Sequence, residues 1–512
     1  MNSMDTRRWW ALAAITLGVL AVGLDVTVLS VALPTLAVSL KASESDLQWF
    51  SSGYALTLAA GMLPAGVLGD RFGRKRILIG ALVLFAAGSV ACAFAVNPGQ
   101  FIAGRLVLGL AGAAIVVMAL SVMTVLFTEE ERPRAVGIWA AANFLALPIG
   151  PIFGGWLLTN FWWGWIFLMN VPVAALGLAA VLALVPESRA ADRPAIDPFG
   201  MVLASGGLAG VTYGLIELGR NGWTDPASLA ILGAGLLAVV GFFAWERYLT
   251  RRPGGRPLID LSLFESRGFT WGVILAALGG LALIGLIFTI PQYSQGVLGL
   301  DPQASGVRLL PIIVGLIIGA VPADRIAERV GPKLTVGAGF AITTAGLLVG
   351  ATTGVDSSPW FVAAWLAVVG FGMGIGFATA ASAALKTVPC EQSGVASALI
   401  QAMQKVGAPF GSAILGSVLV TVYRSQLTLT ALPPELADAV RRSLFAGIAV
   451  ADKLHSATLL ASVRQAFVQG MDAALLISAG TAAFAMVLAL IFLPGRTNPA
   501  IRAESTTAEK VA

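Results

Sequence analysis

Four ionisable side chains lie within long apolar runs of this sequence, where a charge is costly and usually serves a function. They are Asp25, Arg105, Glu217 and Lys405. Burial favours the neutral form of an acid, whereas a nearby base favours its charged form. A carboxyl group that alternately gains and loses a positive neighbour would therefore bind a proton in one state of the protein and release it in another.

Asp25 and Arg105 are expected to lie at a similar depth. Asp25 comes late in the first apolar run, and Arg105 comes early in the fourth, which runs in the opposite direction. With a helical rise of about 1.5 Å per residue, each falls about 8 Å from the same edge of a hydrocarbon core about 30 Å thick. We predict that this pair couples proton binding to a conformational change. A static structural ion pair is the alternative.

The other two charges are less informative. Lys405 falls near the centre of its apolar run, so it must face a cavity, pair with an acid or lose its proton. It either contributes to a binding site or is structural. Glu217 falls close to the end of its run and is expected to be solvated.

Membrane helices must position these residues. The chain of 512 residues is 57% hydrophobic and 12% charged, against about 25% charged in soluble domains. Its apolar runs are continuous and too long for barrel strands, so we predict an all-α polytopic membrane protein with fourteen transmembrane helices. The runs lie at about 10–36, 47–68, 77–96, 100–126, 135–158, 165–186, 200–218, 227–246, 268–292, 305–323, 334–353, 360–385, 394–421 and 473–494.

The positive charges predict the orientation. Most of the 32 Lys and Arg fall in loops that lie on the cytoplasmic side if the N-terminus is cytoplasmic. With fourteen spans, both termini are then cytoplasmic. Arg7 and Arg8 precede the first run as in a signal peptide, but the run is about 25 residues long and lacks a convincing cleavage site, so we expect a retained span.

Two long inner loops, 187–200 and 246–267, bracket the seventh and eighth spans. We predict an N-terminal six-helix bundle at 1–186, a linker with transmembrane helices 7 and 8 at 187–267, and a C-terminal six-helix bundle at 268–512. The last part includes a long outer loop at 424–470 and a cytoplasmic tail. Within the loop, 436–450 is expected to form a surface helix packed over the outer mouth; the alternative is a substrate-binding cap.

Residues 66–76, GVLGDRFGRKR, resemble the signature loop of the major facilitator superfamily, Gly-x-Leu-Ala-Asp-Arg-x-Gly-Arg-Lys, with a departure only at Gly69. A related turn at 323–333 follows the second span of the other bundle, as in transporters built from repeats. The resemblance implies a conformational switch; a topological anchor is the alternative. Its residues are Gly66, Gly69, Asp70, Arg71, Gly73, Arg74 and Lys75, with Asp324, Arg325 and Arg329 in the repeat.

Three further motifs narrow the family. Gly150, Pro151, Gly154 and Gly155 match the Gly-Pro-x-x-Gly-Gly core of the antiporter motif of drug:proton exporters. Residues 24–34 resemble the Leu-Asp-x-Thr-x-x-x-x-Ala-Leu-Pro motif of the fourteen-span drug:proton antiporter branch. Residues 104–109 resemble the superfamily's fourth-span motif, Arg-x-x-Gln-Gly, in which Leu108 replaces the glutamine.

This resemblance implies a major facilitator fold and proton-coupled efflux of small amphiphilic or lipophilic compounds by alternating access, as in multidrug and antibiotic export. An exporter of an endogenous lipid or metabolite is the alternative. A membrane enzyme or channel is disfavoured, and without a Gly-x-x-x-x-Gly-Lys loop ATP is not the expected energy source. We expect no cofactor beyond the proton gradient, no metal and no nucleic acid. The expected setting is a bacterial cytoplasmic membrane, with protons, lipid bilayer and substrate as partners of a functional monomer.

Polar and aromatic residues on inward-pointing spans are the candidates for the substrate cavity, although most aromatic side chains in membrane proteins serve packing instead. Relatives that export dications have several membrane acids near the thirteenth span, where this chain has Gln401 and Lys405. We therefore expect monovalent lipophilic cations, neutral drugs or anionic amphiphiles. The candidates are Tyr54, Asn143, Phe288, Gln292, Tyr293, Gln401, Gln404 and Lys405.

Overall fold

The computed structural model describes the chain except for residues 1–2, 128–130, 132–134, 136–145, 147–148, 190–196, 253–260, 386–392, 430–431 and 495–512. The prediction of an all-α fold is confirmed, because every regular element of the described chain is a helix. The first helices are α1 (Ser3–Ser39), α2 (Glu44–Phe72), α3 (Arg74–Ala93), α4 (Pro98–Leu126), the short α6 (Trp165–Leu168) and α7 (Asn170–Leu184). The central pair is α8 (Pro198–Asn221) and α9 (Pro226–Arg251).

The second half of the chain begins with the short 3-10 helix η1 (Leu261–Glu265) and α10 (Arg267–Gln292), which continues as the π-helical turn η2 (Tyr293–Val297). It is followed by α11 (Pro302–Val307), α12 (Leu310–Val330), α13 (Pro332–Gly350), α14 (Pro359–Leu385) and α15 (Ser393–Gln426). The last helices are α16 (Pro434–Arg442), α17 (Leu444–Lys453) and α18 (Ala457–Phe492).

Several helix starts follow from one local sequence pattern, an Asn or Asp followed by Pro. The side chain of Asn97, Asp197, Asp225 or Asp301 accepts a hydrogen bond from the amide three residues later, and the proline occupies the first helical position. Such a cap satisfies a free amide of the first turn, and the proline loses no hydrogen bond there.

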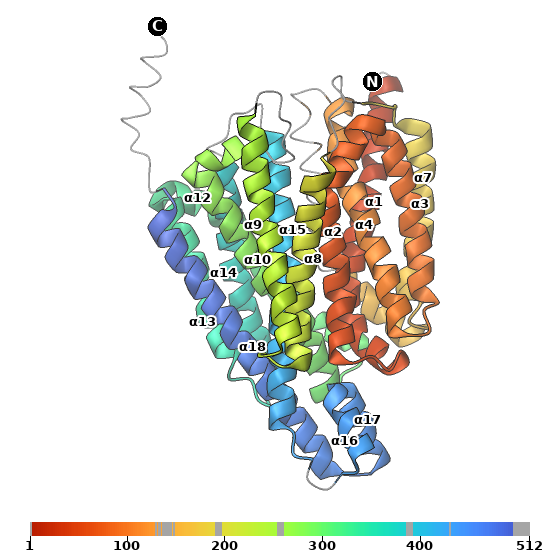
Figure 1. Ribbon diagram of the computed structural model, residues 1–512, viewed down its shortest axis with the longest axis vertical. Coiled ribbons are helices and arrows are strands. Elements are labelled where there is room, and N and C mark those ends of the chain that lie inside the picture. The colour runs from red at the N-terminus through yellow and green to blue at the C-terminus, as the bar shows by residue number, and fades with distance from the viewer. Residues whose placement is uncertain are drawn as a thin grey trace.

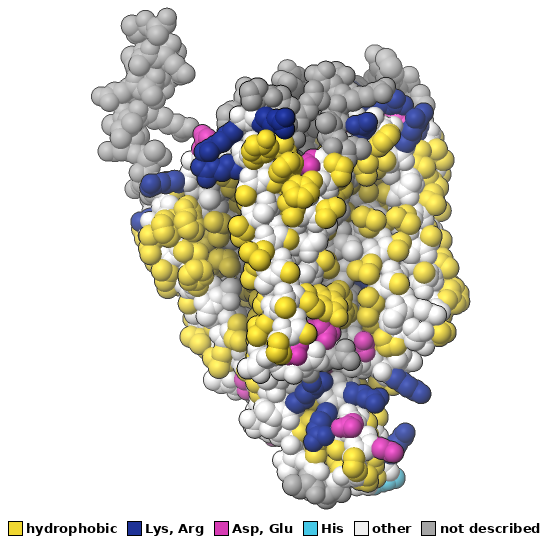
Figure 2. All heavy atoms as spheres, viewed as in Figure 1, with side chains coloured by type: hydrophobic (Ala, Val, Ile, Leu, Met, Phe, Trp, Pro, Cys, Tyr) yellow, Lys and Arg dark blue, Asp and Glu magenta, His cyan; other side chains and the backbone are white. Residues whose placement is uncertain are grey.

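Eleven helices of the described chain are long and apolar enough to cross a membrane. A twelfth results if Glu44–Met62 and Pro64–Phe72, which meet at an angle of 46°, form one span. The expected spans at 135–158 and 394–421 include residues or side chains that are not described, so the count of fourteen stays a prediction. Figure 2 shows a band of mostly hydrophobic side chains between two ends at which Lys and Arg gather.

The helices form two groups. In the first, α1, α2, α3, α4 and α7 pack on one another; in the second, α10, α12, α13, α14, α15 and α18 do so. The pair α8–α9 lies beside both groups, with α8 in contact with α2 and α15 (Figure 1). The helices α16 and α17 lie at the end of the bundle opposite to the start of α1 (Figure 1). We call this the α16–α17 end.

The segment expected as an outer loop at 424–470 is largely helical. The single surface helix expected at 436–450 is wrong, because Ser443 has an extended backbone and caps a new helix, α17. The expected start of the last span near residue 473 is also wrong, since α18 begins at Ala457. Leu459, Val463 and Phe467 are buried along one face of this first part of α18, whose polar residues had suggested a loop.

The two groups are joined in the half of the bundle nearest the α16–α17 end. Gln295 Nε2 donates a hydrogen bond to the Val31 carbonyl over 2.9 Å, and the hydroxyl oxygens of Ser52 and Ser412 lie 2.5 Å apart. The backbone also comes close there. A Cβ added at Gly155 would lie 2.6 Å from the Pro302 carbonyl oxygen, so only glycine permits this contact.

We expect Gly155→Ala to weaken the packing between the two groups, because the added methyl group would overlap backbone atoms that cannot move aside alone. Overpacking of this kind costs about 1–3 kcal/mol, and the midpoint of thermal unfolding of the purified protein should fall. Gly80→Ala is the matched control, since a Cβ at Gly80 meets no atom within 4 Å. Equal midpoints for the two variants would contradict the expected overlap.

Candidate proton and substrate site

The centre of the first helical group contains a buried ion pair. Arg105 Nη1 on α4 donates to Asp25 Oδ2 on α1 over 2.5 Å, and each side chain is 1% exposed. The structure thus brings together the two charges that the sequence placed at one depth. Removal of one partner from such a pair leaves an uncompensated buried charge, at a cost of about 3–5 kcal/mol.

Further contacts hold the guanidinium of Arg105. Its Nε donates to the Phe50 carbonyl over 3.0 Å. Its Cζ lies 4.2 Å from the centre of the Tyr54 ring, a distance at which the ring face attracts a cation. Both partners are on α2, so Arg105 remains held by α2 when its bond to α1 is lost.

Asn170 completes the site and was missed by the sequence reasoning. Its Nδ2, on α7, donates to Asp25 Oδ1 over 3.2 Å and lies 3.3 Å from the Ser89 hydroxyl on α3. The amide and Arg105 therefore occupy different oxygens of one carboxylate. The only sequence signal was a lone amide at the start of an apolar run.

α1 presents a second functional face. Thr27 and Ser30 follow Asp25 by two and five residues, which places them on other sides of the helix. The Thr27 hydroxyl has one proton to donate and lies within 3.2 Å of three backbone carbonyls, those of Gly23, Leu24 and Ala146. The Ser30 hydroxyl donates to the Thr27 carbonyl over 2.7 Å. Both side chains line a cavity between the two helical groups.

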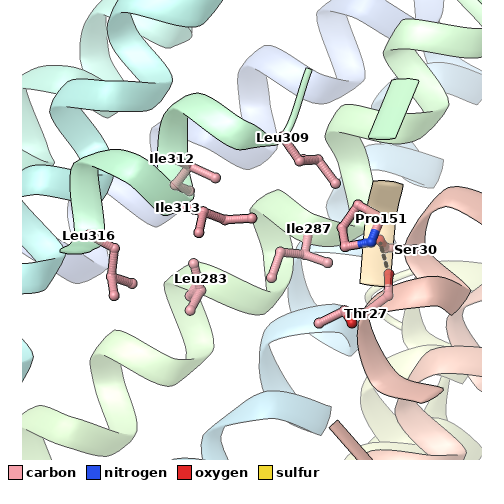
Figure 3. Close-up of a pocket in the computed structure, with 9 residues that line it drawn as sticks. All are labelled: Thr27, Ser30, Pro151, Leu283, Ile287, Leu309, Ile312, Ile313 and Leu316. Atoms are coloured by element: carbon pink, nitrogen blue, oxygen red, sulfur yellow. Dashed lines mark hydrogen bonds between the residues drawn. The ribbon is translucent and has the colours of Figure 1, made fainter. Parts of the chain in front are cut away.

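This cavity is small and almost wholly apolar. Its volume is about 30 Å³, roughly that of one water molecule, whereas drug-sized ligands occupy about 300–1,000 Å³. Figure 3 shows its wall, which is formed by residues of α1, α10 and α12, by Pro151 and by Leu309, the residue before α12. The lining residues are Thr27, Ser30, Pro151, Leu283, Ile287, Leu309, Ile312, Ile313 and Leu316.

The antiporter-motif residues pack around this wall. A Cβ at Gly150 would overlap the Thr27 side chain, and one at Gly154 would lie 2.6 Å from Val28 Cγ1. Pro151 lines the cavity and contacts Gly306, while Gly155 approaches the start of α11. The motif therefore lies between α1 and the second helical group.

The predicted cavity residues lie elsewhere where the structure describes them. Tyr54 packs under Arg105, and Tyr293 donates from its hydroxyl to the Gly354 carbonyl over 2.9 Å, within the second group. Phe288 and Gln292 are buried in α10 and do not line the cavity. Asn143 and the side chains of Gln401, Gln404 and Lys405 lie outside the described residues. Their role in substrate binding stays a prediction.

The charged turn between α2 and α3 contacts several helices. Arg74 pairs with Asp70 at 2.8 Å and donates to the Ser121 carbonyl of α4 over 3.3 Å. The Lys75 amide donates to Glu187, just beyond α7, over 3.2 Å, and the Arg74 amide donates to the Ser188 carbonyl over 2.9 Å. These contacts join four helices of the first group.

The repeat turn shares the backbone shape of the first. Gly73 and Gly331 have φ values of 116° and 93°, each between two helices, in a region that favours glycine. At Gly73 an added Cβ would also lie 2.5 Å from Glu187 Oε1. Asp324, Arg325 and Arg329 of the repeat are exposed and lie on the last turns of α12, before Gly331.

Other acids within the helices are placed as follows. Glu217 accepts a hydrogen bond from Asn221 over 3.1 Å in an exposed setting. Glu44, which was not singled out in the sequence, is 1% exposed and accepts from the Leu444 amide of α17 over 3.4 Å. Over the described residues, no group of three His, Cys, Asp or Glu side chains is placed to hold a metal ion.

Two relatives match this chain almost end to end. A tetracenomycin C resistance and export protein of Streptomyces glaucescens is 32% identical over 96% of this chain and 92% of its own length. The multidrug efflux pump LfrA of Mycolicibacterium smegmatis is 32% identical over 93% of this chain and 94% of its own length.

Solved transporter structures share the fold at low identity. A bacterial homologue of the human lysosomal transporter Spinster, in an inward-facing and unoccupied conformation, matches with a TM-score of 0.68 and 18% identity, over 96% of this chain and 99% of that one. A D-xylose–proton symporter matches with a TM-score of 0.60 and 16% identity, over 95% and 98%. The family model described as Major Facilitator Superfamily matches residues 15–412. This protein therefore belongs to the major facilitator superfamily and is a transporter rather than an enzyme.

Proposed function

We propose that this transporter exports small lipophilic compounds in exchange for protons. The two relatives above are named as a resistance and export protein and as a multidrug efflux pump, and both match nearly the whole chain. The observation that carries the proposal is the double role of α1. One side of this helix holds Asp25 against Arg105, and another side holds Thr27 and Ser30 in the cavity wall.

Proton uptake would act through the ion pair. A proton on Asp25 removes its negative charge, and the attraction that holds α1 to Arg105 is lost. Arg105 keeps its contacts with Phe50 and Tyr54 on α2, so α1 is the helix free to shift. Because Thr27 and Ser30 move with α1, the cavity wall changes with the protonation state. Substrate binding and proton binding then influence one another, as linkage requires.

The cavity wall suggests the substrate chemistry. It contains no charged residue, and its two hydroxyl groups already donate to backbone carbonyls. An apolar wall with few polar groups suits lipophilic neutral compounds or monovalent cations, whose charge is small relative to their apolar surface. The wide cavity that such ligands need would form when the two helical groups separate at the end opposite α16 and α17.

The membrane arrangement completes the proposal. The distribution of Lys and Arg supports cytoplasmic termini, and the α16–α17 end would then face outward. The contacts at Gln295 and Gly155 would then close the outer side, and the switch loop between α2 and α3 would lie on the cytoplasmic side. We propose a bacterial cytoplasmic membrane as the location, a monomer as the functional unit, and the proton gradient as the sole energy source.

We expect Asp25→Asn to abolish proton-driven export, because asparagine keeps a hydrogen-bond acceptor for Arg105 but cannot bind and release a proton. Export is measured as the efflux of a lipophilic fluorescent cation from cells with an imposed pH gradient. The matched control is Asp225→Asn. Asp225 is partly exposed at the start of α9, where hydrogen bonds from Ser228 lower the pKa of its carboxyl. Because this carboxyl stays ionised, it does not take up and release the coupled proton, and its substitution should leave export unchanged. Full efflux by Asp25→Asn at two external pH values would refute the proposed coupling.

We expect Ile313→Ala to change which compounds are exported, because Ile313 lines the cavity. A change of a few methylene groups in an apolar pocket alters discrimination between similar ligands by about tenfold or more. The readout is the relative efflux of three lipophilic cations of increasing size. Ile318→Ala on the same helix is the control, since Ile318 is 57% exposed and faces away from the core. Identical profiles for both variants would place substrate recognition elsewhere.

A further inference from the structure

A second cavity lies at the α16–α17 end, within the second helical group. Its volume is about 430 Å³, large enough for a small organic group. Its wall is formed by the end of η2, by the connection between α13 and α14, by the residue after α11 and by one turn of α18. The lining residues are Val297, Leu298, Leu300, Arg308, Val355, Asp356, Ser357, Pro359 and Arg464. Gly296, the residue before the lining residue Val297, packs closely on α17, because a Cβ added there would lie 2.3–2.9 Å from Leu444.

Two arginines on this wall lack partners. Within the described chain, the guanidinium groups of Arg308 and Arg464 make no hydrogen bond or ion pair with the protein, and Arg464 Nε is buried without a partner. Both residues are half-buried. A charge withdrawn from water without a partner is costly. Arg464 Nε is one such group, and Arg308 adds a second positive charge to the same wall, so the cavity attracts an anionic ligand.

A third charged residue on this wall narrows the chemistry of the possible ligand. Asp356 lines the same cavity, is exposed, and forms no ion pair with either arginine. The wall therefore offers two positive charges and one separate negative charge. Planar guanidinium groups match the oxygens of a phosphate, and a carboxylate attracts an ammonium group. A ligand with one phosphodiester and one ammonium group satisfies all three charges.

The remaining wall is apolar and lies at the membrane boundary. Val297, Leu298 and Val355 supply aliphatic surface beside the arginines. Trp360, which follows the lining residue Pro359, is 83% exposed, and exposed tryptophans at helix ends are typical of the lipid headgroup level. A soluble phosphate needs no apolar wall, whereas the glycerol and upper chains of a lipid do.

We propose that this cavity binds a membrane phospholipid, with its phosphodiester on Arg308 and Arg464 and the ammonium group of phosphatidylethanolamine at Asp356. The site lies outside the cavity between the helical groups and does not depend on the export proposal. It adds a lipid ligand at the α16–α17 end, next to the contact between η2 and α17.

The test uses the purified full-length protein in detergent and dioctanoyl phosphatidylethanolamine as the probe, with binding measured by calorimetry. Because charge-assisted hydrogen bonds to the phosphodiester are lost, the affinity of Arg308→Ala/Arg464→Ala should be at least about tenfold weaker. Arg442→Ala is the matched control, because Arg442 is exposed on α16 and does not line the cavity. If the double variant fails to fold, Arg308→Gln and Arg464→Gln are measured singly and should each weaken binding.

Two comparison ligands test whether the cavity recognises the phosphate of a lipid or free inorganic phosphate. Dioctanoylglycerol lacks the phosphate and should not bind, and inorganic phosphate lacks the chains and should not compete at the concentration at which the lipid binds. Asp356→Asn should reduce the preference for phosphatidylethanolamine over dioctanoyl phosphatidylglycerol. Unchanged affinity in the arginine variants, equal binding of dioctanoylglycerol, or competition by phosphate at lipid-like concentration would each overturn the proposal.

Discussion

The low-dielectric interior of a membrane bundle makes a buried charge acceptable only beside its partner, and the Asp25–Arg105 pair meets that constraint at 2.5 Å. Contacts from α2, α3 and α7 fix the arginine and the carboxylate in place: Phe50 and Tyr54 hold Arg105, and Asn170, itself near Ser89, holds Asp25. The first helical group is thus organised around the buried carboxylate of Asp25 and its partner Arg105. A change of charge at that carboxylate alters the contacts of α1 with several neighbours at once.

α1 can transmit this change because its other neighbours are small. Gly150 and Gly154 face Thr27 and Val28 without side chains of their own, and such smooth contacts let membrane helices approach closely. The cavity on that side holds about 30 Å³, which is too small for a drug-sized compound. In our proposal the two groups separate at the end opposite α16 and α17 to admit substrate, while the contacts at Gly155 remain closed.

The sequence predicted the parts that follow from helical rise and from glycine or proline chemistry. Asp25 and Arg105 could be paired because depth can be counted along two apolar runs, and the turn at Gly73 could be expected because its backbone favours glycine. Asn170 could not be predicted, since partners across a bundle depend on helix rotation. The wall of the small cavity between the groups could not be predicted either, because aliphatic residues such as Ile313 look the same in every run. Tyr293, a predicted substrate residue, donates to the Gly354 carbonyl, and its role in substrate binding stays a prediction. The start of α18 was misplaced because polar residues of a helix that line a cavity resemble those of a loop.

Proton-coupled export by this mechanism requires that substrate and proton compete through α1. The most direct measurement adds a lipophilic cation to the purified protein in weakly buffered detergent solution and records the pH. Our account predicts that the wild-type protein releases protons on substrate binding, with saturation at the same concentration as binding itself, and that Asp25→Asn binds substrate without release. Proton release that is unchanged in Asp25→Asn, or substrate binding by the wild type without release, would contradict it.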